Sequence, residues 1–269
     1  MYGAILGDII GSPYEFAYWE RNKSFELFPK YARFTDDTVM TVAIANALLD
    51  CGKDADEAEY ENAFIDAMQK WGTEYIDAGY GGMFYKWLIN KSPQPYGSFG
   101  NGSAMRVSPV GWMFDSLEKT REVAKWSALV THNHPEGIKG AEATASIIWM
   151  SRNKTSKKEI KEYIEKEFLY DLSRSCDDIR PNYEFNATCQ GSVPEAIISF
   201  LEATDYEDCI RNAVSLGGDT DTLACIAGGM AEAFYGIPEG MLVEGKKRLT
   251  PDIKDLMDKY YNCIVIRKN

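Results

Sequence analysis

Residues 60–71, with the sequence YENAFIDAMQKW, decide the fold class because their apolar side chains follow the period of an α-helix. Positions i, i+4, i+7, i+8 and i+11 are occupied by Tyr60, Phe64, Ala67, Met68 and Trp71. The same period returns in residues 160–168, and alternating strand patterns are nearly absent. Only residues 263–266 are rich enough in β-branched side chains to suggest a strand. The sequence therefore predicts an all-α protein of some ten to thirteen helices.

Several predicted helices carry start signals. Ser156, Ser192 and Thr204 are each followed three residues later by Glu, which is the pattern of a capping box. Pro251, directly after Thr250, is typical of a first helical turn. These signals predict helix starts near residues 156, 192, 204 and 250.

Gly3, Gly7 and Gly11 recur every four residues and therefore share one face of a predicted first helix. Each glycine costs a helix about 1 kcal/mol relative to alanine, so a compensating contact is expected. We expect another helix or a ligand to approach this face closely.

The chain is organised as one domain spanning residues 1–269, since no Pro- or Ser-rich linker or low-complexity segment divides its 269 residues. Two stretches, 91–103 and 175–191, are rich in Gly, Pro, Ser or Asn and predict long loops. Loops longer than about twelve residues in a compact domain are often functional.

Composition excludes several classes of function. With 29 Lys and Arg against 41 Asp and Glu, the net charge is −12, which disfavours unmodified nucleic acid or an anionic membrane as partner. No 18-residue apolar run is present, and the first residues lack the basic region of a signal peptide. We therefore expect a cytoplasmic protein and, by default, a monomer.

The metal-binding residue types narrow the chemistry further. The six cysteines are never closer than 13 positions, so a CxxC pair is excluded. The only histidines, His132 and His134, cannot form a three-His or HExxH zinc site. Any metal ligands should therefore be oxygens.

Three segments place carboxylates beside small residues at predicted helix ends: GDIIGSPYE (7–15), FTDDT (34–38) and GGDTDT (217–222). Helix capping would explain one such cluster, but a cap needs only one side chain. Neighbouring carboxylates repel one another unless a cation lies between them, and Mg²⁺ or Mn²⁺ prefers oxygen ligands. The candidate ligands are Glu15, Thr35, Asp36, Asp37, Asp219, Asp221 and Thr222. Their five carboxylates would nearly neutralise two divalent ions.

Two further motifs have both a plain and a functional interpretation. SFGNGSAMR (98–106) can be a simple turn or a loop whose backbone N–H groups bind phosphate at a helix start. THNHP (131–135) lies between two predicted helices, where a histidine is more often structural than functional.

Together and in this order, the motifs resemble those of the ADP-ribosylglycohydrolase family, over most of the chain. The matching pieces are residues 7–15, 34–38, 97–106, 131–135 and 217–222. The resemblance implies a compact all-α fold with a dinuclear Mg²⁺ or Mn²⁺ centre. One side of the metal pair would be held by Thr35, Asp36 and Asp37, and the other by Asp219, Asp221 and Thr222, with Asp221 bridging and Glu15 facing the second metal.

The same resemblance implies a substrate site. ADP-ribose would be bound by the loop residues Gly97, Ser98, Phe99, Gly100, Asn101 and Gly102, and by His132. The implied reaction is hydrolysis of the bond between the ADP-ribose anomeric carbon and a modified side chain. The partner would be an ADP-ribosylated protein or a small ADP-ribose conjugate. Glu15 or Asp36 would take the proton from water.

This chain has no acid between Asp77 and Asp115, so a carboxylate base from the loop before Gly100 is excluded and Glu15 is the preferred base. One alternative is a non-catalytic ADP-ribose-binding or structural relative, although all seven candidate ligands are present. A prenyl-diphosphate enzyme is disfavoured because Met40 occupies the position where its acidic motif needs Asp.

Overall fold

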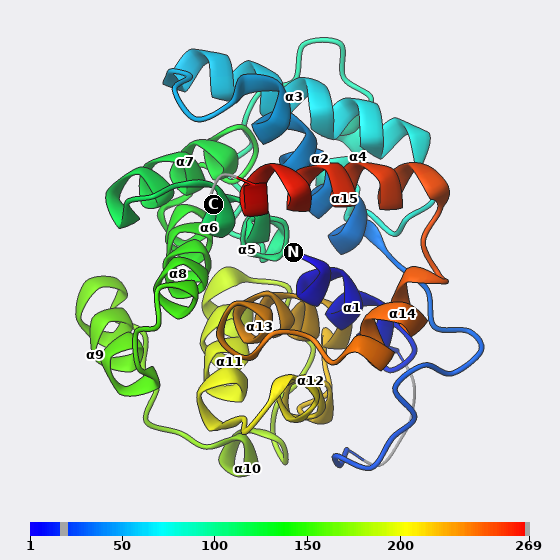
Figure 1. Ribbon diagram of the computed structural model, residues 1–269, viewed down its shortest axis with the longest axis vertical. Helices are drawn as coiled ribbons and strands as arrows, with labels where there is room; N and C mark the ends of the chain where they lie inside the picture. The colour runs from blue at the N-terminus through cyan, green and yellow to red at the C-terminus, as the bar shows by residue number, and fades with distance from the viewer. Residues whose placement is uncertain (17–20, 267–269) are drawn as a thin grey trace.

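The computed structural model describes residues 1–16 and 21–266, and within them the chain forms fifteen α-helices and no β-strand (Figure 1). The helices are α1 (Tyr2–Gly11), α2 (Asp36–Cys51), α3 (Glu57–Glu74), α4 (Gly82–Leu88), α5 (Gly102–Met105), α6 (Ser108–Met113), α7 (Leu117–Leu129), α8 (Pro135–Arg152), α9 (Lys157–Phe168), α10 (Cys176–Ile179), α11 (Cys189–Glu202), α12 (Tyr206–Ser215), α13 (Thr220–Tyr235), α14 (Glu239–Lys246) and α15 (Pro251–Ile266). The predicted all-α class is confirmed, but the predicted helix number was too low. Helices α4, α5, α6 and α10 have only four to seven residues, too few for a periodic pattern to show.

The possible strand at 263–266 was wrong, because these residues continue α15. Tyr260 and Ile264, four positions apart, are both buried on one face of this helix. The β-branched Ile264 is therefore buried against the core as part of a helix and not of a strand.

Each start signal lies within three residues of a helix start, but two of the three predicted capping boxes do not form. Ser156 forms the predicted capping box with Glu159, and α15 begins at Pro251. Thr188 caps α11 instead of Ser192, whose hydroxyl donates to the Asn186 carbonyl. Asp205 caps α12 one residue after Thr204.

Helices α1 and α13 form the antiparallel centre of the molecule (Figure 1). All ten residues of α1 are buried, as expected for a helix that is apolar on every side. A Cβ at Gly3, Gly7 or Gly11 would run into the α13 backbone, so the predicted close approach is to another helix. Thr220 Oγ1 donates to the Gly11 carbonyl over 2.9 Å, which joins the end of α1 to the start of α13.

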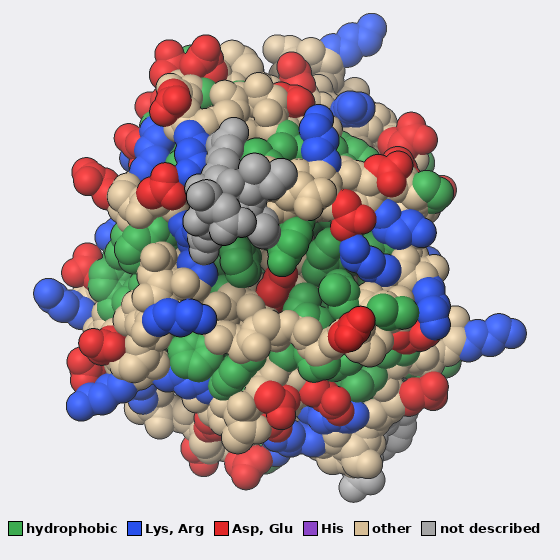
Figure 2. Space-filling view, in the orientation of Figure 1, with side chains coloured by type: hydrophobic (Ala, Val, Ile, Leu, Met, Phe, Trp, Pro, Cys, Tyr) green, Lys and Arg blue, Asp and Glu red, His purple; other side chains and the backbone are tan. Residues whose placement is uncertain are grey.

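Other helices surround this pair. Helices α11 and α12 pack against α13, while α2 packs against α3 and α15 (Figure 1). Acidic and basic side chains are interspersed on the face shown in Figure 2, so the acidic excess does not form one patch there. None of the described helices is long and apolar enough to cross a membrane.

Candidate functional site

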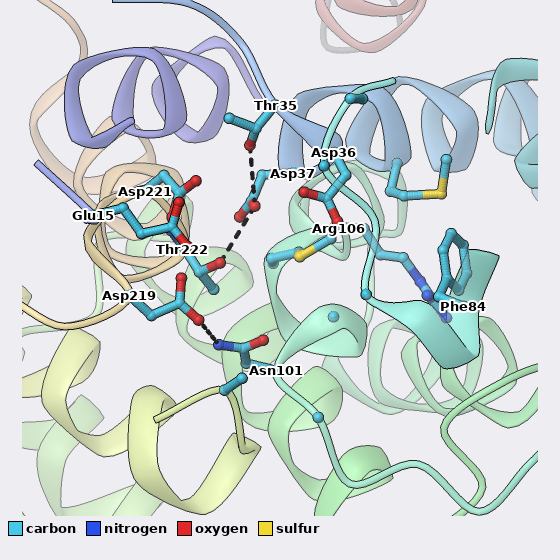
Figure 3. A pocket seen from close by; sticks show the side chains of 18 of the residues that line it. Glu15, Thr35, Asp36, Asp37, Phe84, Asn101, Arg106, Asp219, Asp221 and Thr222 are labelled. Atoms are coloured by element: carbon cyan, nitrogen blue, oxygen red, sulfur yellow. Dashed lines mark hydrogen bonds between the residues drawn. The ribbon is translucent and has the colours of Figure 1, made fainter. Parts of the chain in front are cut away.

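A cavity of about 530 Å³ lies where the starts of α2 and α13 meet the loop after α1. Carboxylates from these three segments line one side (Figure 3). The N-termini of α2 and α13 carry partial positive charge, which favours acidic side chains at this place.

The carboxylates form two clusters that share Asp221. Ligand atoms of Asp8, Asp37 and Asp221 lie within 4.8 Å of one another, and so do those of Glu15, Asp219 and Asp221. Residues separated by up to 213 positions thus meet at one point. Four of the predicted acids, Glu15, Asp37, Asp219 and Asp221, are brought together in this way.

These side chains do not cap their helices. Thr35 and Asp219 stand at the N-cap positions of α2 and α13, yet neither makes a side-chain capping hydrogen bond in the described structure. Capping therefore fails to explain why acids and threonines gather here.

Asp8 belongs to the cluster although the sequence analysis gave it no role. It is fully buried, and its carboxylate accepts hydrogen bonds from the backbone and the hydroxyl of both Thr35 and Thr38. With its oxygens engaged, Asp8 fixes the first turn of α2. The available signal was a single acid inside the otherwise apolar run of α1.

Asp37 lies between the two threonines that were predicted as ligands. Thr35 Oγ1 and Thr222 Oγ1 lie 3.4 and 3.3 Å from Asp37 Oδ2 (Figure 3). Asp37 Oδ1 is buried and has no hydrogen-bond partner among the described residues. An unpartnered buried oxygen is costly unless a cation satisfies it, so this donor set fits a hard divalent ion.

Electrostatics support the same conclusion. Burial, followed by the charges of Asp219 and Asp36, raises the pKa of Glu15 to about 8. Burial and neighbouring acids raise the pKa of Asp36 to about 7 and also raise those of Asp37 and Asp221. None of these carboxylates forms an ion pair with a Lys or Arg that the structure describes, so protons or a bound cation must neutralise them.

Asp36 lines the same cavity but belongs to neither three-residue cluster. Its carboxylate lies on the side of the cavity towards Arg106 and Phe84 (Figure 3). Asp36 is thus placed beside the clusters and not within them.

The glycine-rich loop forms another part of the cavity wall. Ser98, Gly100, Asn101 and Gly102 line the cavity, and Asn101 Nδ2 donates to Asp219 Oδ2 over 2.7 Å. The loop is therefore tied directly to one of the acids.

The two other predicted loop residues contact the segment 133–134. Gly97 turns the chain at φ +68° and donates its N–H to Asn133 Oδ1. Phe99 is half-exposed, and its ring lies 5.3 Å from that of His134. Neither belongs to the described lining of the cavity.

The backbone of the loop offers fewer free donors than the motif suggested. The Gly100 N–H donates to Ser98 Oγ, and the Asn101 N–H donates to the Ala187 carbonyl. Helix α5 has only four residues, so its dipole is weak. Side-chain donors must therefore contribute to any anion binding.

His132 also lines the cavity, and its ring lies next to the glycine-rich loop. Further lining residues had no predicted role, among them Phe16, Arg33, Met83, Phe84, Tyr96, Arg106, Phe185 and Ala187. Phe16 and Phe185 stack at the mouth with ring centroids 6.0 Å apart. Such contacts between distant segments leave no local pattern in a sequence.

Known proteins resemble this chain to different degrees. The sequence model of the ADP-ribosylglycohydrolase family matches residues 1–266. ADP-ribosylhydrolase ARH3 of Homo sapiens is 26% identical over 308 residues, covering 88% of this chain and 84% of that protein. ADP-ribosylarginine hydrolase Tri1 of Pseudomonas putida is 22% identical over 271 residues, covering 88% of this chain and 70% of that protein. A solved ADP-ribosylglycohydrolase-related protein complex superposes with a TM-score of 0.73 at 22% identity, covering 97% of this chain and 95% of that chain, which shows a common fold.

Proposed function

Because this chain belongs to the ADP-ribosylglycohydrolase family, we propose that it is a metal-dependent hydrolase that removes ADP-ribose from a modified side chain. The cleaved bond is the one at the anomeric carbon of the distal ribose. The names of its ARH3 and Tri1 relatives support an ADP-ribose conjugate as the substrate class. The observation that carries the proposal is the pair of carboxylate clusters sharing Asp221 in the wall of a cavity.

Two divalent ions, Mg²⁺ or Mn²⁺, would be held by Glu15, Thr35, Asp36, Asp37, Asp219, Asp221 and Thr222. When bound, such ions supply positive charge that polarises substrate hydroxyls and acidifies water. The free Asp37 Oδ1 and the shared position of Asp221 support this ligand set.

The protein's own residues then position the substrate. Ser98, Asn101, Gly102 and His132 would hold the diphosphate and ribose against the cavity wall. Asn101 links that wall to Asp219, so the sugar is oriented relative to the acids.

Glu15 is the preferred proton carrier. It lies on the loop after α1 at the cavity wall, with a carboxylate oxygen within 4.8 Å of ligand atoms of Asp219 and Asp221, where a carboxylate can accept a proton from water and release it again. It would take a proton from the attacking water and return one to the acceptor side chain as the anomeric bond breaks. Asp36 is the alternative base.

A release assay tests this proposal. Peptides carrying ADP-ribose on arginine or serine, and an acetyl-linked ADP-ribose, should be incubated with the protein in Mg²⁺, in Mn²⁺ and in chelator. We expect free ADP-ribose from at least one substrate, with release lost in chelator and restored by the metal. The variant Asp219→Asn should lose this release, whereas Asp66→Asn, on the exposed surface of α3, should retain it.

The alternatives predict different results. A protein that binds ADP-ribose with no release from any of the three substrates would be a non-catalytic relative. Release that is unaffected by chelator would contradict the metal-dependent mechanism.

A further inference from the structure

Arg106 lines the cavity but has no acidic partner among the described residues. It is 1% exposed, and no carboxylate among the described residues pairs with it. Its Nη2 group donates to the Ser127 carbonyl over 2.7 Å and to Thr131 Oγ1 over 2.8 Å. Burying a guanidinium without a carboxylate partner is costly. The position of Arg106 therefore requires an explanation beyond packing.

Thr131 connects this arginine to His132. Thr131 Oγ1 lies 2.7 Å from His132 Nδ1 as well as 2.8 Å from Arg106 Nη2. A guanidinium can only donate, so Thr131 Oγ1 is the acceptor in the hydrogen bond from Arg106 Nη2. The single hydroxyl proton of Thr131 is then available for the imidazole.

Donor counting sets the tautomer of His132. If Nδ1 carried the proton, the hydroxyl of the fully buried Thr131 would have no acceptor among the described residues, and an unsatisfied buried donor is costly. With Nδ1 as acceptor, the Thr131 proton is used inside the protein, and the proton of the neutral ring lies on Nε2, on the side of the cavity.

The Nε2 atom faces the glycine-rich loop. A Cβ built on Gly102 would lie 3.0 Å from Nε2, and one built on Gly100 would lie 3.5 Å from it. Within residues 1–16 and 21–266, Nε2 has no hydrogen-bond partner, and His132 lines the cavity. The free donor is therefore directed towards the place where a ligand would lie.

The charge of Arg106 also opposes a second proton on the ring. Burial, and then the nearby guanidinium, lowers the pKa of His132 well below its ordinary value. A neutral imidazole can still donate from Nε2, and this donor supplements the few free N–H groups of the loop.

We propose that Arg106 and Thr131 are positioning residues that hold His132 as its Nε2–H tautomer, a neutral donor for an oxygen of the ADP-ribose diphosphate. The ligand in this proposal rests on the proposed function, whereas the tautomer does not. The two residues act through His132 and need not touch the substrate.

Nitrogen-15 NMR of the histidines tests the tautomer directly, because the chain contains only two of them. The measurement uses the ligand-free protein in chelator, and His134→Gln assigns the two ring systems. We expect His132 to show a protonated Nε2 and an Nδ1 that accepts a hydrogen bond. A protonated Nδ1, or a doubly protonated ring at neutral pH, would overturn the proposal.

Substitutions of Thr131 test the connection. Thr131→Val removes the hydroxyl, so the Nδ1 resonance should move to that of a free pyridine-type nitrogen, and ADP-ribose should bind about tenfold more weakly. Thr131→Ser keeps the hydroxyl and should restore both values. An unchanged Nδ1 resonance and unchanged affinity in folded Thr131→Val would overturn the positioning role.

The two proposals can fail separately. If the wild-type protein shows the expected tautomer but releases no ADP-ribose, the role of Arg106 and Thr131 stands and the proposed hydrolase activity is wrong. If ADP-ribose is released but His132 Nδ1 is protonated, the proposed hydrolase activity stands and the positioning role is wrong.

Discussion

Asp8 and Asp37 lie in one carboxylate cluster but use their oxygens differently. The oxygens of Asp8 accept four hydrogen bonds from Thr35 and Thr38, whereas Asp37 Oδ1 has no described partner. We infer that Asp8 orients the start of α2 and that Asp37 faces the metal. Substituting a residue that orients metal ligands in this way often lowers the affinity for the metal strongly.

Asp8→Asn tests this division of roles. The amide nitrogen cannot accept from the Thr35 hydroxyl, so Thr35 must turn and the neighbouring ligands lose their orientation. We expect Mn²⁺ affinity, measured by calorimetry, to fall about 10–100-fold while the fold is retained. Asp66→Asn, on the exposed face of α3, is the control and should bind Mn²⁺ like the parent. Equal affinity in both variants would contradict the role of Asp8.

Gly102 offers a second test at the scale of one residue. A Cβ there would lie 3.0 Å from His132 Nε2, and the two methyl groups of valine would need still more room. We expect Gly102→Val to weaken ADP-ribose binding in calorimetry by about tenfold or more, as the Nε2 donor is displaced. Metal-dependent stabilisation should be unchanged, because Gly102 belongs to neither carboxylate cluster. Unchanged ADP-ribose affinity would mean that the loop is only a turn.

The sequence located the acids well but not their individual roles. Clusters at 34–38 and 217–222 stand out because two carboxylates adjoin small residues, and the structure brings Glu15, Asp37, Asp219 and Asp221 together. Asp8 was missed since one acid in an apolar helix has no characteristic spacing. Its role depends on the approach of Thr35, 27 positions away.

Among the elements, α1 and α13 matter most for the site. Their close antiparallel packing places the end of α1 beside the start of α13, and thus brings Glu15 near Asp219 and Asp221. The four-residue period of Gly3, Gly7 and Gly11 predicted such an approach. The partner helix could not be predicted, since α13 lies more than 200 residues further along the chain and its own surface pattern is apolar on every side.

Gly7→Ala tests the importance of this packing. The added methyl group would meet the backbone of Ala224, which cannot move as a side chain can. We expect a loss in the free energy of unfolding of about 3 kcal/mol or more, at the upper end for overpacked cores, measured by urea denaturation. Gly240→Ala in α14 is the matched control, because nothing lies near its added Cβ. That change should be neutral or stabilising by up to about 1 kcal/mol. Equal stability of the two variants would contradict the close contact.

At the scale of the whole molecule, part of the net charge of −12 comes from acidic side chains that are buried. Basic and acidic side chains alternate on the surface in Figure 2, whereas Asp8, Asp37, Asp219 and Asp221 are all buried around one cavity. Folding the metal-free chain therefore concentrates like charges. The stability of the protein should depend on whatever neutralises them, either protons or cations.

Protons give one prediction. The pKa values of Glu15 and Asp36 are raised to about 8 and about 7, so the folded state favours their protonated forms. This contribution to stability is fully present below the ordinary pKa of a carboxyl group and is lost as the pH rises through 7 and 8. In chelator, the melting temperature should be higher at pH 6 than at pH 8.5. In Mg²⁺, the stabilisation by metal should increase with pH, because metal and protons compete for the same oxygens. A pH-independent melting temperature in chelator would contradict the charge concentration.

Cations give the sharper prediction, and Asp221 tests it because both clusters share this residue. For one site at a hundred times its dissociation constant, a bound ion stabilises the fold by about 2.7 kcal/mol, or several degrees of melting temperature in a chain of this size. Asp221→Asn removes the shared charge, so we expect it to abolish ADP-ribose release and most of the stabilisation by Mg²⁺ or Mn²⁺.

In chelator, the same variant should melt at the parent's temperature or slightly above it, because one repelling carboxylate is gone. If the acids served only the helix starts, the substitution would instead cause a small loss of stability that is the same with and without metal. Melting curves of both proteins in chelator, Mg²⁺ and Mn²⁺ distinguish these cases. A parent protein whose melting and release of ADP-ribose are both indifferent to chelator would refute the metal centre.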